Sequence, residues 1–175
     1  MHDTFDRIDE NSFSDNPYRV SEIYQHHWGG CVMFKIKILI VDDEEDFRDT
    51  LVNRLIKREI DASGAESGEK ALELVRKFDY DVIILDIRMP GMDGIETLRQ
   101  VKSIKPLVEV ILLTGHATIE SGVEGMKLGA FDYVIKPADL DSLMEKINLA
   151  YEKKALHDKK IYEATIRDIT KSKFI

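Results

Sequence analysis

The sequence predicts a doubly wound α/β fold, and three observations support this prediction. From about residue 35 onward, short runs of β-forming residues alternate with longer segments whose apolar residues recur at helical spacing. Most of the short runs are almost continuously apolar, which is typical of strands buried on both faces of a parallel sheet. Each run is followed by a segment long enough for the right-handed crossover that joins parallel strands. We therefore expect a five-stranded parallel sheet with helices on both faces.

The elements follow one another in strict alternation. Five strands are expected at Ile36–Val41, Ile60–Ala65 (the weakest), Val82–Leu85, Val108–Leu113 and Phe131–Ile135. Four helices are expected between them at Glu44–Arg58, Gly68–Phe78, Gly94–Ile104 and Thr118–Leu128, and a fifth begins near Asp139. Each helix carries one apolar face, as Phe47, Leu51 and Leu55 do in the first.

The two ends of the chain lack this pattern. Residues 1–33 show no sustained period, so we expect a flexible N-terminal extension before a domain at residues 34–152. Met33 lies just before the first strand and is an alternative start of translation. Residues 153–175 are expected to lengthen the last helix or to form a disordered tail, with a partner-binding or dimerising helix as the alternative.

Composition excludes several classes of protein. The net charge of −8 argues against direct nucleic-acid binding, which usually requires a basic face. No apolar run approaches the roughly 20 residues of a membrane span, and the N-terminal residues lack the features of a secretory signal. We therefore expect a cytoplasmic protein without membrane insertion.

Polar side chains follow four of the five expected strands. Asp42 and Asp43 follow the first strand, Asp86 the third, Thr114 the fourth and Lys136 the fifth. Taken singly, each has an ordinary explanation as a helix cap, a turn residue or a solvated charge. Together they place three carboxylates, a hydroxyl and an ammonium at the edge where doubly wound sheets bind ligands.

This combination of groups suits phosphoryl chemistry. Three converging carboxylates repel one another unless a cation neutralises them, and oxygen ligands suit Mg²⁺. Lys136 and Thr114 could meet phosphoryl oxygens, and Asp86 is the candidate nucleophile that would form an aspartyl phosphate. The loop after Asp86 is expected to be shaped by Pro90, Gly91 and Gly94, with Asp93 capping the third helix.

Four motifs occur in an order that resembles one known family. LIVDDEE, LDIRMPGMDG, LLTGHA and DYVIKP are similar to the motifs of receiver domains in two-component response regulators, and the resemblance covers about residues 35–152. It implies a flavodoxin-like three-layer fold with strand order 2-1-3-4-5, which makes the first and third strands neighbours and brings Asp43 beside Asp86. The stretch from Leu113 to Pro137 further resembles receivers that precede ATPase activators of the alternative sigma factor.

The resemblance also implies a role for each site residue. Asp86 would be the phosphoacceptor, and Mg²⁺ would be bound by Asp43, Asp86 and the backbone carbonyl of Arg88, with Asp42 acting through a water. The remaining roles are a phosphoryl contact for Lys136, a switch made by Thr114 and Tyr133, and a cis peptide bond before Pro137.

The implied function is that of a stand-alone signalling receiver. A sensor histidine kinase or phosphotransfer protein would phosphorylate Asp86, and the domain would act on an unidentified protein, with a homodimer formed on phosphorylation as an alternative assembly. The chain would catalyse only its own phosphorylation and dephosphorylation. The output alternatives are a phosphorelay intermediate and a phosphate sink. Rival interpretations are a magnesium-dependent phosphohydrolase, a flavin- or nucleotide-binding module, and a receiver that works without phosphorylation.

Overall fold

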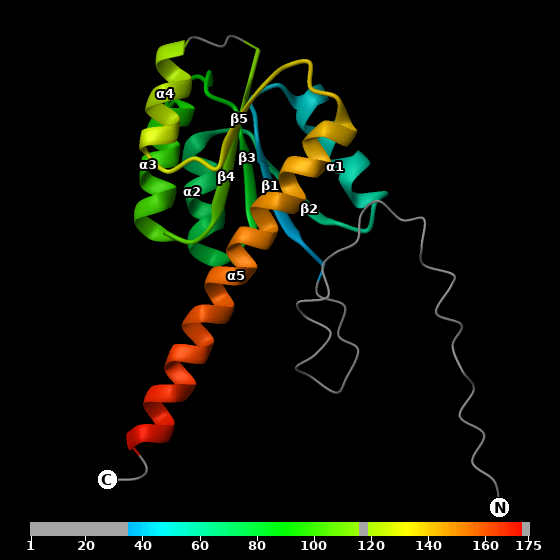
Figure 1. Cartoon of the computed structure of the whole chain (residues 1–175). Helices are drawn as coiled ribbons and strands as arrows, with labels where there is room; N and C mark the ends of the chain where they lie inside the picture. The colour runs from blue at the N-terminus through cyan, green and yellow to red at the C-terminus, as the bar shows by residue number, and fades with distance from the viewer. Residues whose placement is uncertain (1–34, 116–118, 173–175) are drawn as a thin grey trace, which may run out of the picture. The chain divides into compact units, whose positions relative to one another are not determined.

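The structure, a computed structural model, describes residues 35–115 and 119–172. Parallel strands and helices alternate along this part of the chain (Figure 1). The strands are β1 (Lys37–Val41), β2 (Asp61–Ala65), β3 (Val82–Leu85), β4 (Glu109–Thr114) and β5 (Asp132–Ile135). The helices are α1 (Glu45–Ile56), α2 (Gly68–Lys77), α3 (Gly94–Ile104), α4 (Ile119–Lys127) and α5 (Leu140–Ser172). The predicted N-terminal extension, residues 1–33, lies outside the described residues.

The strand order is β2-β1-β3-β4-β5, which confirms the predicted topology. Val41 pairs with Leu85, so the residues that follow β1 and β3 leave the sheet at the same level. Thr114 pairs with Ile135, so Lys136 follows β5 one residue beyond that pair. The backbone N–H of Lys136 donates to the Thr114 carbonyl at 2.8 Å, and the next peptide bond, to Pro137, is cis, as the resemblance implied.

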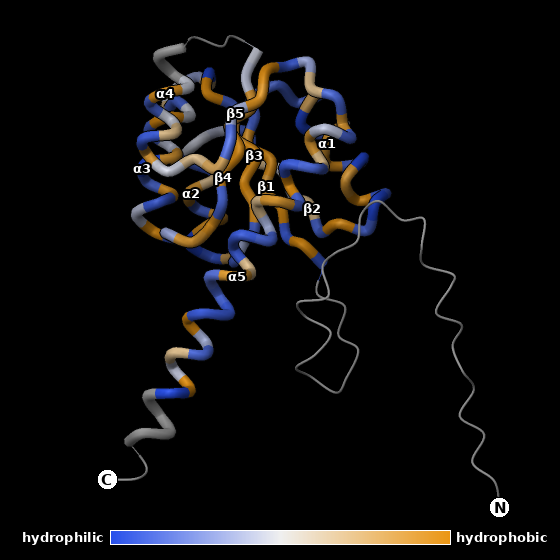
Figure 2. The backbone as a smooth tube through the Cα atoms, in the orientation of Figure 1, coloured by the Kyte–Doolittle hydropathy of each residue, from blue (hydrophilic) through white to orange (hydrophobic). Residues whose placement is uncertain are grey.

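The core lies on both faces of the sheet because β3 is apolar throughout and β1 and β4 are apolar at all but their end positions. α1 and α5 cover one face and α2, α3 and α4 cover the other (Figure 1). Hydrophobic colouring concentrates on β1, β3 and β4 (Figure 2), where Ile38, Ile83 and Leu112 are fully buried. Burying such a side chain stabilises the folded state by roughly 1.5–3 kcal/mol. The packed strands therefore fix the positions of the residues at their ends.

Short polar side chains cap the starts of α2 and α3. Ser67 accepts a hydrogen bond from the Lys70 N–H at the start of α2, and Asp93 accepts one from the Glu96 N–H at the start of α3. These bonds satisfy amide groups that have no partner within the first turn. The Asp93 cap confirms the sequence prediction.

The last helix continues beyond the sheet (Figure 1). α5 packs on the sheet through Leu143, Met144 and Ile147, and Ala155 is the last buried residue among those of the helix whose side chains are described, up to residue 167. Residues 153–172 continue the same helix, as the lengthened-helix interpretation predicts, whereas the proposed domain boundary at residue 152 stays a prediction. None of the helices in the described ranges is long and apolar enough to cross a membrane.

Candidate phosphoryl-transfer site

The residues predicted at the strand ends converge on one edge of the sheet. One carboxylate oxygen from each of Asp42, Asp43 and Asp86 lies within 4.8 Å of the other two. Asp42 and Asp86 are buried, whereas Asp43 is exposed. Thr114 is fully buried at the end of β4. The β1–β3 adjacency produces this cluster, because the two strands end side by side.

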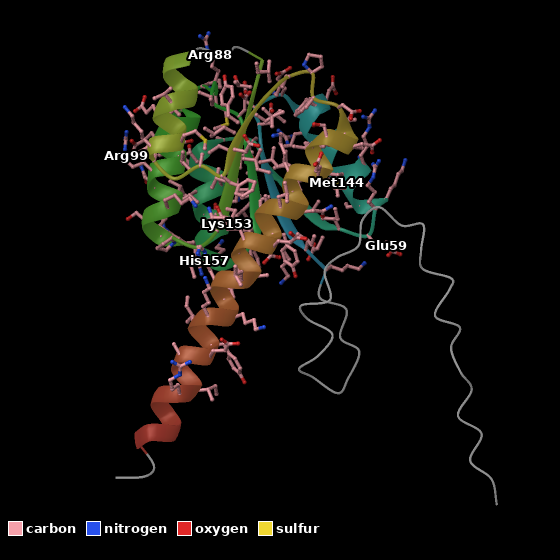
Figure 3. All side chains as sticks on the ribbon, in the orientation of Figure 1. Glu59, Arg88, Arg99, Met144, Lys153 and His157 are labelled. Atoms are coloured by element: carbon pink, nitrogen blue, oxygen red, sulfur yellow. The ribbon has the colours of Figure 1, made fainter. Side chains whose placement is uncertain are left out.

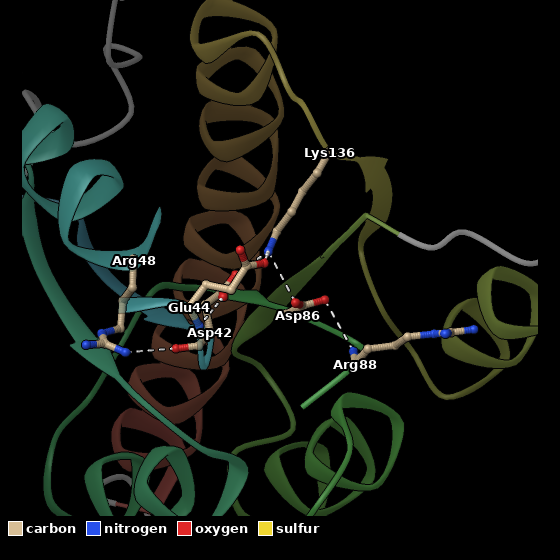
Figure 4. Close-up of polar contacts among 6 residues, drawn as sticks. All are labelled: Asp42, Glu44, Arg48, Asp86, Arg88 and Lys136. Carbon is tan, nitrogen blue, oxygen red and sulfur yellow. Dashed lines mark hydrogen bonds and ion pairs between the residues drawn. The ribbon is translucent and has the colours of Figure 1, made fainter. Parts of the chain in front are cut away.

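The Lys136 ammonium group lies beside the carboxylates of Asp42 and Asp86 (Figure 4). The Lys136 Nζ atom lies 2.6 Å from Asp42 Oδ2, 3.2 Å from Asp86 Oδ2 and 3.4 Å from Glu44 Oε1. The Lys136 side chain is only 12% exposed. Burial acts against its charged form, but the hydrogen bonds and negative charges of Asp42 and Asp86 outweigh burial and raise the pKa of Lys136. The ammonium is therefore fully charged at neutral pH.

Hydrogen bonds hold both the backbone and the carboxylate of Asp42. Its backbone N–H donates to the Ala65 carbonyl at 3.1 Å, and its own carbonyl accepts from Arg48 Nη1 at 3.0 Å. Its Oδ1 atom accepts the Glu44 N–H at 3.0 Å. Burial raises the pKa of Asp42, and the hydrogen bond from Lys136 offsets only part of that effect. Ionised Asp42 therefore benefits from any further positive charge.

Asp86 is positioned by the start of the following loop. Its N–H donates to the Val41 carbonyl at 2.9 Å, and its Oδ1 atom accepts the Arg88 N–H at 3.2 Å. The Arg88 side chain is exposed and extends away from the carboxylates (Figure 4). At Gly94 an added Cβ would lie 2.1 Å from the Asp86 carbonyl oxygen, so glycine allows α3 to start directly against the backbone of Asp86.

The protein's own charges at this site are unbalanced. Three carboxylates face one ammonium, and Glu44 adds a fourth negative group at the rim. Clustered oxygen ligands of this kind suit a hard divalent cation, which would neutralise the excess charge. The donor set therefore fits a divalent metal ion, as the sequence predicts.

This geometry agrees with comparison to known proteins. Residues 38–148 match the family described as the response regulator receiver domain.

The chain belongs to this receiver family.

Named relatives support the assignment. The receiver is 45% identical over 107 residues to the regulatory protein AtoC of Escherichia coli K12, an alignment that covers 61% of this chain and 23% of AtoC. It is 37% identical over 139 residues to the transcriptional regulatory protein ZraR of Escherichia coli O157:H7, covering 79% of this chain and 30% of ZraR. The chain thus spans less than a third of the length of either relative.

Solved structures show the same fold. The structure is similar to a CheY-like receiver domain protein from Methanospirillum hungatei, with a TM-score of 0.69 and 27% identity over 71% of this chain and 99% of that one. The shared fold includes the five-stranded parallel sheet with order 2-1-3-4-5.

Tyr133 of the receiver lies on β5, next to α4. Its ring packs against the core, and a Cβ added at Gly122 of α4 would lie 3.7 Å from the ring. Its hydroxyl is buried and has no hydrogen-bond partner within the described residues. The ring therefore fills the space under α4.

Three contacts of the receiver's site were missed by sequence reasoning. Glu44 contacts the Lys136 ammonium, Arg48 holds the Asp42 carbonyl, and the Phe47 ring centroid lies 4.2 Å from Lys136 Nζ. The sequence assigned Phe47 only to the apolar face of α1. The position of Phe47 in the first turn of α1 could have indicated this contact, because that turn lies at the same edge of the sheet as the strand ends.

Proposed function

We propose that this receiver accepts a phosphoryl group on Asp86 from a histidine kinase or phosphotransfer protein in the cytoplasm. A carboxylate oxygen of Asp86 attacks the phosphorus of the donor's phosphohistidine, the P–N bond breaks, and the donor imidazole leaves with the bonding electron pair. The product is an aspartyl phosphate. The observation that carries this proposal is the convergence of Asp86 with two further carboxylates and the Lys136 ammonium.

Lys136 supplies the positive charge that this chain itself brings to the reaction. Its Nζ atom lies 3.2 Å from Asp86 Oδ2, so it can contact oxygens of a phosphoryl group attached there. The Thr114 hydroxyl, buried at the neighbouring strand end, is the second proposed phosphoryl contact.

The acidic cluster fits Mg²⁺ as the metal. Asp43, Asp86 and the backbone carbonyl of Arg88 would hold the ion directly, and Asp42 would act through a water. When bound, the ion neutralises the negative charge of the carboxylates and of the phosphoryl oxygens.

The proposed output is a change in protein contacts. Movement of Thr114 toward the phosphoryl group would shift Tyr133 and the adjacent α4, changing the face formed by α4, β5 and α5. Large apolar side chains are already exposed on these elements: Val123, Met126, Ile135 and Leu149. Such a face suits a protein partner, which includes an effector, a phosphorelay component or a second copy of the chain.

Intact-mass measurement after incubation with acetyl phosphate and Mg²⁺ tests this function. We expect one phosphoryl adduct on the wild type, lost on alkaline treatment and absent when EDTA is present during labelling. Asp86→Ala should carry no adduct, whereas Asp79→Asn, an exposed aspartate outside the site, should label like the wild type. Equal labelling of wild type and Asp86→Ala would remove Asp86 as the acceptor.

A further inference from the structure

The Phe47 ring is an uncharged neighbour of the Lys136 ammonium. The centroid of the Phe47 ring lies 4.2 Å from Lys136 Nζ, well within the roughly 6 Å range of cation–π attraction. Phe47 belongs to the first turn of α1, and Lys136 follows β5, so the contact joins two segments that are distant in sequence. The Lys136 side chain is largely buried, which strengthens the attraction because little water competes for the ammonium.

The ring acts on the ammonium differently from the carboxylates. Asp42, Asp86 and Glu44 each lie within 3.4 Å of Nζ and can each accept one of its N–H groups. A phosphoryl group on Asp86 must take over some of these hydrogen bonds. An aromatic face attracts the cation electrostatically without accepting a conventional hydrogen bond, so this attraction can persist while the N–H groups change partners.

We infer that Phe47 is a positioning residue for phosphoryl transfer: its ring keeps the Lys136 ammonium over Asp86 before and after the hydrogen bonds are exchanged. This inference rests on the proposed phosphorylation of Asp86. Its physical basis is preorganisation, because a lysine side chain has four rotatable bonds, and ordering it during the reaction carries an entropic penalty.

Packing alone does not account for Phe47. Leu51 and Leu55 follow on the same face of α1 and are buried, whereas Phe47 is only half-buried at the edge of the sheet. An aliphatic side chain would serve a packing role at this position. The distinguishing property is therefore the aromatic face rather than the volume.

Single-turnover labelling by acetyl phosphate with saturating Mg²⁺ measures this effect. We expect Phe47→Leu to slow adduct formation roughly 3- to 10-fold and Phe47→Tyr to stay within about 2-fold of wild type. Progressively fluorinated phenylalanines at position 47 should slow the reaction in step with the number of fluorines, because fluorine weakens the negative ring face without removing the ring. The matched control is Phe131→Leu, which removes the ring 5.4 Å from Lys153 Nζ and should not change the rate.

A double-mutant comparison separates positioning from packing. In a Lys136→Met background, Phe47→Leu should cause no further loss of rate, because the ring then has no cation to hold. An equal loss in both backgrounds, or a Phe47→Leu rate equal to wild type, would overturn the inference while leaving phosphorylation of Asp86 intact.

A second measurement does not depend on phosphorylation. NMR relaxation of isotope-labelled lysine side chains should show an ordered Lys136 side chain in wild type and Phe47→Tyr, and greater motion in Phe47→Leu. Unchanged Lys136 order in Phe47→Leu would overturn the inference even if the wild type accepted no phosphoryl group. Failure of the proposed function would appear instead as absence of the adduct on a wild type whose Lys136 is ordered by Phe47.

Discussion

Each of the two edges of the sheet has a buried carboxylate next to a lysine. Carboxylates are in excess at one edge and ammonium groups at the other. The carboxyl-edge pocket, formed by Asp42, Asp43, Asp86 and Lys136, has three carboxylates for one ammonium. The amino-edge clamp, formed by Glu109, Lys102 and Lys153, has one carboxylate for two ammonium groups (Lys153 is labelled in Figure 3). β4 joins the two, since it starts at Glu109 and ends at Thr114.

At each edge, burial shifts the pKa of a group whose charge is in excess. In the pocket, burial raises the pKa of Asp42. In the clamp, burial lowers the pKa of Lys102, and the charge of Glu109 offsets only part of this effect. Each lysine of the clamp nevertheless has a close partner. Lys153 Nζ lies 3.0 Å from Glu109 Oε1, and Lys102 Nζ donates to the Val108 carbonyl at 2.7 Å. The clamp joins α5 to the start of β4 through the Lys153–Glu109 pair, whereas the excess carboxylates of the pocket favour a bound cation.

Removing the clamp's carboxylate should give the largest change in stability. Glu109→Gln leaves two lysines without their buried counter-charge, and we expect a loss of about 2 kcal/mol in the free energy of unfolding. The value is below that of a fully buried pair because the Lys153 side chain is 48% exposed. Urea unfolding measures the loss, with the exposed Glu73→Gln as the control that should have little effect. Equal stability of Glu109→Gln and wild type would show that the clamp does not hold α5.

Adding the cation should stabilise the pocket but not the clamp. At ten times its dissociation constant, Mg²⁺ should add about 1.4 kcal/mol to the stability of the wild type. Asp43→Asn should abolish most of this gain, because it removes the exposed member of the cluster. Thermal melts with and without Mg²⁺, at matched ionic strength, measure the difference. A gain of the same size in Asp43→Asn would place the cation elsewhere.

Sequence reasoning was accurate where local pattern decides structure. The predicted strand and helix ends mostly lie within one or two residues of the observed ones, because apolar runs and capping residues such as Asp93 mark them directly. The pocket followed from topology, since parallel strands bring Asp42 and Asp86 to the same edge. The Phe47–Lys136 contact depends on how α1 lies against the sheet, which periodicity does not define. The Glu109–Lys153 pair joins residues 44 positions apart in the sequence, so no local pattern indicates it.

The effect of Asp42→Asn on thermal stability should depend on pH, because it removes a buried carboxylate from the carboxyl-edge pocket. The raised pKa of Asp42 means that the folded state binds its proton more tightly than the unfolded chain does. The associated stability is fully present below the unfolded value of 3.8 and is lost as pH rises through the folded pKa. At pH 7 and without metal, ionised Asp42 therefore lowers the stability of the folded wild type. Asp42→Asn removes this buried charge, so the Tm of the variant should be a few degrees above that of the wild type.

This gain should shrink as the pH falls toward 4. The pKa of Lys136 is raised from its ordinary value of 10.5, so the stability that this ammonium contributes is lost only above that pH. Lys136 therefore does not contribute to the trend in the acid range. Melting curves of both proteins in EDTA between neutral pH and about pH 4 measure the trend. A lower Tm for Asp42→Asn at pH 7 would mean that the Lys136 pair outweighs the burial of Asp42.

The smallest effect is expected at the rim of the pocket. Glu44 contacts the same ammonium as Asp42 and Phe47, but its side chain is 67% exposed and its Oε1 atom lies 3.4 Å from Nζ. Water and salt screen such a charge, so Glu44→Gln should weaken Mg²⁺ binding by less than about 2-fold at physiological salt. Isothermal titration at low and at physiological salt measures this effect, which should be larger at low salt. A loss as large as that of Asp43→Asn at both salt concentrations would mean that the pocket requires four carboxylates, and that its negative charge begins in the turn before α1 rather than at the ends of the strands.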